Sequence, residues 1–192
     1  MFSKPLCGID EAGRGPLAGP LIMAGVVLEG SFANIGLADS KKLTEKKREM
    51  LYGLITQNTR FHIVSFSAAQ IDQWGISKCL QEGLQSIQLY LPHCDYLFDG
   101  NSTFGAKDIR TMIKADDKIP EVSAASILAK VTRDREMKVL ARKYPDYGFE
   151  KHKGYGTKAH IEALAKYGRC KVHRHTFRVK ELDQPTLFNV FK

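Results

Sequence analysis

Five acidic residues lie just beyond apolar segments that the sequence predicts to be strands: Asp10, Glu11, Asp99, Asp116 and Asp117. Sites in open α/β sheets tend to form beyond strand ends, so these carboxylates are candidates for a shared site. Carboxylates gathered at one edge repel one another and need a compensating cation. Their oxygen atoms favour Mg²⁺ or Mn²⁺, and a pair of such ions can promote phosphodiester hydrolysis. For each acid alone, a turn or helix-cap role is the alternative.

The elements that would position these acids predict an α/β chain with a mixed sheet and helices against its faces. Strands are expected at Leu6–Ile9, Leu21–Leu28, Phe61–Phe66, Tyr96–Phe98 and Arg110–Ile113. Helices are expected from Thr44 to about Gln57, over Leu80–Leu91, from Pro120 to Lys143, and from Thr157 to Gly168. A Gly/Pro-rich segment, residues 13–20, joins the first two strands.

Charge and composition indicate a single soluble domain with a polyanionic partner. The 192 residues carry a net charge of +8, and residues 130–180 hold fifteen Lys and Arg against five Asp and Glu. Such a basic segment suggests nucleic acid, although a basic face without a partner is the alternative. We expect no membrane span and a reduced, cytoplasmic setting, because the longest apolar run is Leu21–Leu28 and the four cysteines are scattered.

Five sequence blocks give the chain its resemblance to bacterial ribonuclease HII, which extends over about residues 6 to 178. They are Gly8–Pro20 (GIDEAGRGPLAGP), Asp39–Leu43 (DSKKL), Phe98–Gly100 (FDG), Ser123–Asp134 (SAASILAKVTRD) and His152–Thr157 (HKGYGT). The resemblance implies a ribonuclease H-like mixed sheet flanked by helices, with a C-terminal helical extension. It implies a catalytic core over residues 1–144, a helical region over 145–178 that completes the substrate groove, and a tail over 179–192.

The same resemblance implies a metal-dependent endoribonuclease. Such an enzyme hydrolyses the RNA strand of RNA–DNA hybrids and cuts 5′ of ribonucleotides embedded in duplex DNA, leaving 3′-hydroxyl and 5′-phosphate ends. The resemblance implies two Mn²⁺ or Mg²⁺ ions and four acidic ligands, and these ligands map onto Asp10, Glu11, Asp99 and Asp116. Asp116 is identified by counting back from the Ser123–Asp134 block. The family usually has Gly before this acid, whereas this chain has Ala115, so Asp117 stays open as the alternative.

Substrate contacts are also implied by the resemblance. Gly13, Arg14 and Gly15 match the segment that reads the junction between a ribonucleotide and the next deoxynucleotide; glycines let the backbone approach closely, and backbone groups can bond a 2′-hydroxyl. A tight turn is the alternative. Tyr155 matches the tyrosine that stacks on the following deoxyribose, with a core tyrosine as the alternative. Phosphate contacts, or ordinary surface cations, are expected at Lys41, Lys42, Lys130, Arg133 and Lys153.

The C-terminal tail resembles the short peptides that bind bacterial sliding clamps. Gln184, Leu187 and Phe188 have the required types and spacing, and a Leu-Phe pair can fill an apolar pocket. The alternative is that these side chains, with Phe191, fold back on the protein itself. We otherwise expect a monomer.

The residues support other functions less well. A non-catalytic nucleic-acid-binding module is disfavoured because carboxylates beside phosphates serve a metal enzyme and not a simple binder. A ribonuclease HIII-type nuclease is disfavoured by its different glycine segment and by a signature that here starts at Gly8. A DNA resolvase of the same fold is disfavoured by Gly13–Gly15. Acid–base cleavage by histidines is also rejected, and most of the four histidines in residues 152–175 are expected on the surface.

Overall fold

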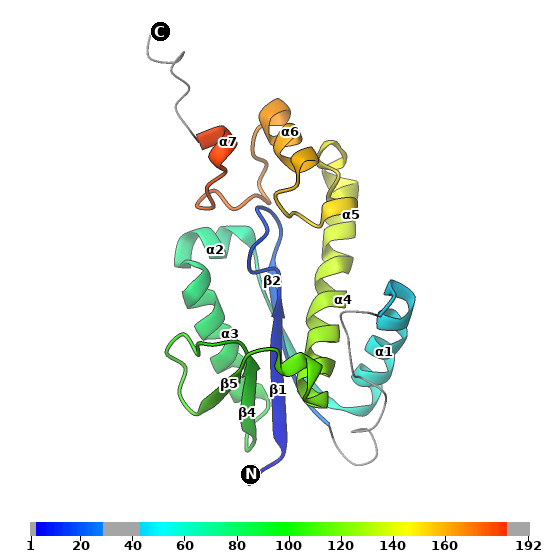
Figure 1. Ribbon diagram of the computed structural model, residues 1–192, viewed down its shortest axis with the longest axis vertical. Coiled ribbons are helices and arrows are strands. Elements are labelled where there is room, and N and C mark those ends of the chain that lie inside the picture. Colours follow the sequence, from blue (N-terminus) through cyan, green and yellow to red (C-terminus); the bar gives the residue numbers. More distant parts are fainter. Residues whose placement is uncertain (1–2, 29–42, 184–192) are drawn as a thin grey trace.

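A five-stranded mixed sheet forms the centre of the molecule, with helices on both faces (Figure 1). The computed structural model describes residues 3–28 and 43–183. The sheet order is β3-β2-β1-β4-β5, with β1 at Leu6–Ala12, β2 at Leu21–Val27, β3 at Arg60–Phe66, β4 at Asp95–Asp99 and β5 at Ile109–Met112. β2 is antiparallel to both β1 and β3, whereas β1, β4 and β5 run parallel. The predicted α/β mixed sheet is confirmed.

The helices form two layers and a separate group at one end of the sheet (Figure 1). They are α1 (Glu45–Asn58), α2 (Ala68–Trp74), α3 (Ile76–Tyr90), α4 (Pro120–Lys143), α5 (Phe149–His152), α6 (Lys158–Tyr167) and α7 (Lys180–Asp183), with 3₁₀ turns η3 (Ala115–Asp117) and η4 (Pro145–Tyr147). Helices α2 and α3 cover one face of the sheet, and α1 and α4 cover the other. Helix α2 and the shorter turns and helices were not predicted.

Strand β2 is buried from both faces, which explains its continuous apolar sequence. Leu21 and Met23 belong to the core on the α3 side, which also contains Leu84 and Ile87. The alternate residues of β2 join the second core, under α1 and α4: Ile22, Ala24 and Val26. The sheet thus supplies both cores and gives the acid-bearing strand β1 a rigid neighbour.

Helix α4 connects the sheet to the C-terminal region. Its 24 residues span about 36 Å, and Pro120 occupies its first turn. Near its start it lies directly against Gly8 of β1, where a Cβ atom would approach the backbone carbon of Glu121 to 2.2 Å. Near its end, Met137 and Ala141 enter a third core formed with the C-terminal helices. One helix therefore contacts both the strand that bears Asp10 and the region that bears Tyr155.

The C-terminal region is packed against the core rather than extended from it. Asp72 of α2 accepts hydrogen bonds from the amides of His175 and Thr176, at 2.8 and 2.9 Å. Val179, which the sequence assigned to the tail, is 3% exposed and belongs to the third core, and α7 follows it. Residues 179–183 of the expected tail are therefore a buried valine followed by a short helix. Gln184, Leu187 and Phe188 lie outside the described residues.

Candidate metal and nucleic-acid site

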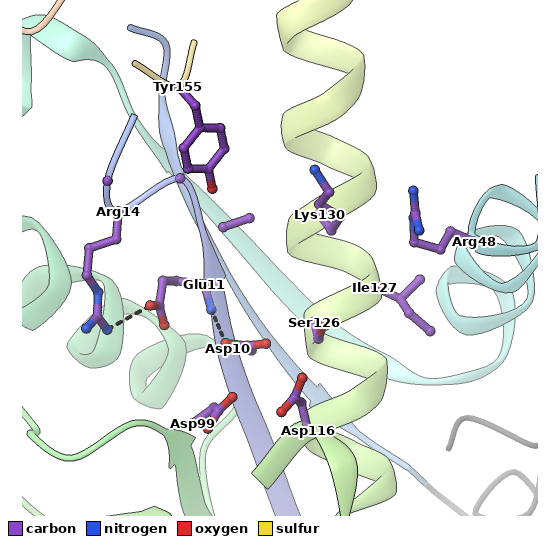
Figure 2. Close-up of a pocket in the computed structure, with 13 residues that line it drawn as sticks. Asp10, Glu11, Arg14, Arg48, Asp99, Asp116, Ser126, Ile127, Lys130 and Tyr155 are labelled. Atoms are coloured by element: carbon purple, nitrogen blue, oxygen red, sulfur yellow. Dashed lines mark hydrogen bonds and ion pairs between the residues drawn. The ribbon is translucent and has the colours of Figure 1, made fainter. Parts of the chain in front are cut away.

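Three carboxylates from different elements meet at one edge of the sheet (Figure 2). Asp10 lies on β1, Asp99 ends the adjacent parallel strand β4, and Asp116 lies in η3. Carboxylate oxygens of the three residues lie within 4.8 Å of one another. Parallel pairing of β1 with β4 places the first two side by side, and the short η3 turn before α4 brings in the third.

Burial makes this cluster electrostatically unfavourable for the protein by itself. Asp116 is 1% exposed and Asp10 is 9% exposed. Burial raises the pKa of Asp10 well above its ordinary value, and the negative charges of Glu11 and Asp99 raise it further, although the Glu11 amide donates to the Asp10 carboxylate at 2.7 Å. A cation among these groups would remove the repulsion.

The donor set fits a hard divalent cation. The clustered ligand atoms are all carboxylate oxygens, which suit Mg²⁺ or Mn²⁺ better than softer metals. Asp99 is oriented by the amide of Ala115, which donates to its Oδ1 at 3.1 Å. Asp117, the alternative fourth acid, is exposed and lies outside the cluster, whereas Asp116 lies within it. The structure therefore favours Asp116 of the two.

Glu11 lines the same cleft but is paired with a cation. Its Oε1 lies 2.7 Å from Nη2 of Arg14, and its Oε2 is buried without a hydrogen-bond partner (Figure 2). Burial raises the pKa of Glu11 to about 7, against the opposing effect of the Arg14 cation. The structure does not bring Glu11 into the group of three carboxylates, so its role as a ligand stays a prediction.

A cleft of about 460 Å³ surrounds the acids. Its lining is Asp10, Glu11, Ala12, Gly13, Arg14, Gly15, Arg48, Asp99, Asp116, Ser126, Ile127, Lys130 and Tyr155. Most of the predicted substrate residues are therefore brought together with the predicted metal ligands. Acids lie at the base, while Arg14, Lys130 and Tyr155 stand around them (Figure 2). Tyr155 is 47% exposed, which excludes its alternative reading as a core residue.

The predicted phosphate contacts do not all reach this cleft. Lys130 lines it while pairing with Asp134 at 2.7 Å, but Lys153 is not among its lining residues and donates to the Glu150 carbonyl at 2.8 Å. Lys41 and Lys42 lie outside the described residues. The phosphate contacts expected of these residues stay predictions.

The position of Arg133 differs from the one predicted from the sequence. It was expected to contact phosphate, but it is 1% exposed and its guanidinium donates to the carbonyls of Ala18, Pro20 and Lys153. Its Nε and Nη2 donors are thus directed to main-chain acceptors rather than to phosphate. The sequence did not reveal this, because two of these partners precede Arg133 by more than 110 positions.

Two polar residues of the cleft lining were not predicted from the sequence. Arg48 of α1 faces the cleft, and Ser126 lies on α4 beside the acids (Figure 2). The signal for Ser126 was its spacing from Lys130, since residues four apart share one helix face. Arg48 follows the DSKKL block by five positions and was not separable by type from the other basic residues around it.

Two of the four histidines in residues 152–175 are buried, whereas most of the four were expected on the surface. His160 and His173 are 0% and 1% exposed, and their Nε2 atoms lie 3.0 Å apart. The Cys170 amide donates to His173 Nδ1, so His173 Nε2 donates to His160, whose Nδ1 donates to the Tyr155 carbonyl at 2.9 Å. Burial lowers the pKa of both histidines, that of His173 to about 4. This neutral chain supports the backbone of Tyr155.

Comparison with known proteins agrees with this geometry. The family model described as "Ribonuclease HII" matches residues 7–180. The chain belongs to the ribonuclease HII family. It is 72% identical over 186 residues to the ribonuclease HII of Sulfurovum sp. (strain NBC37-1), covering 97% of this chain and 98% of that protein. It is 54% identical over 183 residues to the ribonuclease HII of Aliarcobacter butzleri (strain RM4018), covering 94% of each.

A solved structure shows the same fold. The structure of the PCNA:RNase HII complex from Archaeoglobus fulgidus matches with a TM-score of 0.80 and 29% identity, covering 96% of this chain and 99% of that one. The ribonuclease H-like fold is therefore confirmed, as is the prediction of a hydrolytic nuclease. Like the ribonuclease HII family generally, it is a ribonuclease H that depends on divalent metal. Membership of this enzyme family excludes the alternative of a non-catalytic nucleic-acid-binding module. Within the described ranges, no helix is both long and apolar enough to cross a bilayer.

Proposed function

We propose that this ribonuclease HII cuts 5′ of single ribonucleotides embedded in duplex DNA, as well as the RNA strand of RNA–DNA hybrids. The observation that carries the proposal is one cleft that holds three clustered carboxylates together with Gly13, Gly15 and Tyr155. Acids alone would support a general phosphodiesterase. Their position beside the exposed backbone of Gly15 and an exposed aromatic ring supports recognition of the sugar at the cut.

The metal ligands in this proposal are Asp10, Asp99, Asp116 and, after release from Arg14, Glu11. Two Mn²⁺ or Mg²⁺ ions held there would supply an activated water and charge neutralisation for hydrolysis, giving 3′-hydroxyl and 5′-phosphate ends. Until substrate binds, Arg14 neutralises Glu11 across 2.7 Å. A backbone phosphate near Arg14 would compete for this cation and free the Glu11 carboxylate, whose Oε2 already lacks a hydrogen-bond partner.

Gly15 gives the strongest support for sugar recognition. A Cβ atom built there would meet nothing within 4 Å, so the fold does not require glycine at this position. A ligand whose sugar lies against the backbone would require it. Gly13 differs, because its φ of 97° and the Arg133 side chain 2.2 Å from a built Cβ explain glycine there by folding alone. Tyr155 then presents its ring to the next deoxyribose, and Lys130 and Arg48 provide cations for phosphates.

The test is cleavage of a DNA duplex that carries one ribonucleotide, with Mg²⁺ or Mn²⁺, followed by mapping of both product ends. We expect one cut on the 5′ side of the ribonucleotide. Asp116→Asn should abolish the cut, while Asp117→Asn, altered at the exposed neighbour, serves as the matched control and should retain it. No cleavage of this duplex by an enzyme that degrades RNA–DNA hybrid would overturn the proposed specificity.

We further propose that the C-terminal segment binds a sliding clamp through Gln184, Leu187 and Phe188. The support is the residue pattern, together with the PCNA complex reported for the Archaeoglobus fulgidus ribonuclease HII. The chain truncated after Asp183 should lose clamp affinity in surface plasmon resonance while cutting free duplex normally. Phe188→Ala should weaken binding more than Asn189→Ala. Equal clamp affinity of full-length and truncated chains would end this proposal.

A further inference from the structure

Two buried arginines hold the segment 13–20 by its carbonyl groups. Arg174 is 0% exposed, although it lies some 160 residues further along the chain. Its Nη2 donates to Gly13 O at 2.6 Å, and its Nη1 donates to Arg14 O at 2.9 Å. Both Nε and Nη2 donate to Gly19 O, at 3.1 and 3.0 Å. The backbone of Arg174 adds a bond from its own amide to Leu17 O at 2.8 Å.

Arg133 joins the same segment to the one that carries Tyr155. Its Nε donates to Pro20 O at 3.0 Å, and its Nη2 donates to Ala18 O and to Lys153 O, at 3.3 and 2.9 Å. Its guanidinium carbon lies 5.7 Å from the centroid of the Tyr155 ring. The two arginines therefore fix both parts of the cleft that are expected to contact sugar.

Main-chain oxygens surround these guanidinium groups. A buried cation costs several kcal/mol unless hydrogen bonds replace its lost hydration, and carbonyl oxygens provide them here. Arginine suits this role better than lysine, because its planar fork presents five donors at fixed angles. Burial, together with the neighbouring Arg133 cation, lowers the pKa of Arg174 to about 10, so it stays charged at neutral pH.

The carbonyls held by Arg174 determine where the next amides point. A trans peptide unit is planar, and its N–H points opposite to its C=O. Because Gly13 O and Arg14 O point at Arg174, the N–H groups of Arg14 and Gly15 point away from it. Within the described chain neither amide donates a hydrogen bond, and both residues line the cleft.

We propose that Arg174, assisted by Arg133, is a positioning residue for recognition of the ribonucleotide. It aims the Arg14 and Gly15 amides toward the sugar, while Arg133 keeps Tyr155 in register with them. Neither arginine touches the substrate. This inference rests on the proposed function and extends it to residues that lie outside the cleft lining.

The test uses the position of the cut rather than its rate. The substrate is a DNA duplex with four consecutive ribonucleotides, and the readout is the ratio of cuts at the RNA–DNA junction to cuts elsewhere in the ribonucleotide stretch. A variant that is only less stable loses rate at every position and keeps this ratio. Arg174→Lys retains the cation but not the fork, and should lower the ratio about tenfold. Arg133→Lys should lower it less.

Matched controls lie close to both positions. Arg135, which pairs with Glu49, lies on the same helix as Arg133, and Arg135→Lys is its control. Arg178 is an exposed arginine near Arg174 in the sequence, and Arg178→Lys is the second control. Both should keep the wild-type ratio. Hydrogen–deuterium exchange gives a readout that does not depend on activity: amides of residues 13–20 should exchange at least tenfold faster in Arg174→Lys.

The outcomes separate the two proposals. An unchanged cut ratio and unchanged exchange in folded Arg174→Lys would overturn the positioning role. If Arg174→Lys does not fold, an unchanged ratio in Arg133→Lys would do the same. A wild-type enzyme without junction preference would instead overturn the proposed function, and the exchange comparison would still test whether Arg174 holds the segment.

Discussion

The segment that runs from β1 into residues 13–20 contacts two clusters of buried charge that are stabilised in opposite ways. At the sheet edge, Asp10, Asp99 and Asp116 crowd three carboxylates together, and burial, followed by the negative charges of Glu11 and Asp99, raises the pKa of Asp10. A few residues on, Arg133 and Arg174 are enclosed by carbonyl oxygens that satisfy their donors. We propose that a divalent cation completes the first cluster, whereas the fold itself completes the second. Buried charge therefore serves metal chemistry in the proposed site and stabilises the architecture of the neighbouring segment.

The largest contrast is expected in activity. Asp10→Asn should lower cleavage on the order of 10³-fold or more, because a neutral amide is a poor ligand for a hard cation. Its stability should not fall in metal-free buffer. The pKa of folded Asp10 is raised, so ionisation at neutral pH destabilises the native state, and the substitution removes that cost. Urea unfolding with chelator present measures this. A large loss of stability would contradict the assignment of this cluster to ligand binding.

For the buried arginines we expect, in contrast, a large loss of stability. Arg174→Met should destabilise the protein by about 3–5 kcal/mol, because it leaves the carbonyls of Gly13, Arg14 and Gly19 without donors in a buried setting. Arg135→Met, which removes a surface ion pair, should cost about 1 kcal/mol or less. Equal losses of unfolding free energy in the two variants would show that the buried guanidinium contributes no more than a surface pair.

The buried histidine pair should make the C-terminal region sensitive to acid. The pKa of folded His173 is lowered to about 4 from an unfolded value near 6.5, so the unfolded chain binds more protons between these values. Stability is therefore complete above pH 6.5 and falls as the pH drops toward 4, by up to about 3 kcal/mol. The lowered pKa of His160 acts in the same direction. His173→Asn should flatten this dependence in urea unfolding, and His175→Gln, at an exposed histidine, should not.

The smallest effect separates the two glycines. Gly15→Ala should leave the unfolding temperature within error, because a Cβ there meets nothing within 4 Å, yet it should lower cleavage beside a ribonucleotide about tenfold. Gly13→Ala should lower stability as well, since its φ of 97° disfavours alanine and Arg133 occupies the Cβ position. Full activity of Gly15→Ala would remove the main support for sugar recognition at that residue.

Much of the fold could be predicted from periodicity and capping residues. The run Leu21–Leu28 identified a strand buried on both faces, and Thr44 and Thr157 cap the helices predicted from them. Helix α2 was not predicted, because seven residues are too few to show a helical period. Its start was nevertheless marked by Ser67 and Gln70, which form a capping box. The sheet order was not predicted, because pairing depends on long-range contacts that no local pattern contains.

Site residues could be predicted where the type of side chain determines the role, but not where burial of the side chain determines it. Acids after apolar segments identified Asp10, Asp99 and Asp116, and the structure places Asp116 rather than the alternative Asp117 in the cluster. The burial of Arg133, predicted as a phosphate contact or a surface cation, was missed, because composition cannot show that a polar side chain will be enclosed. The same holds for His160 and His173, two of the four histidines of which most were expected on the surface. Two acceptors of Arg133, the carbonyls of Ala18 and Pro20, come from a distant segment, and only the folded chain brings these groups together.

A crystal structure determined with Mn²⁺ tests the central claim most directly, since anomalous scattering locates the ion without reference to activity. We predict a peak between the carboxylates of Asp10, Asp99 and Asp116, and loss of that peak in Asp10→Asn. An empty sheet edge at Mn²⁺ concentrations that support cleavage, or ions bound only elsewhere, would contradict the account.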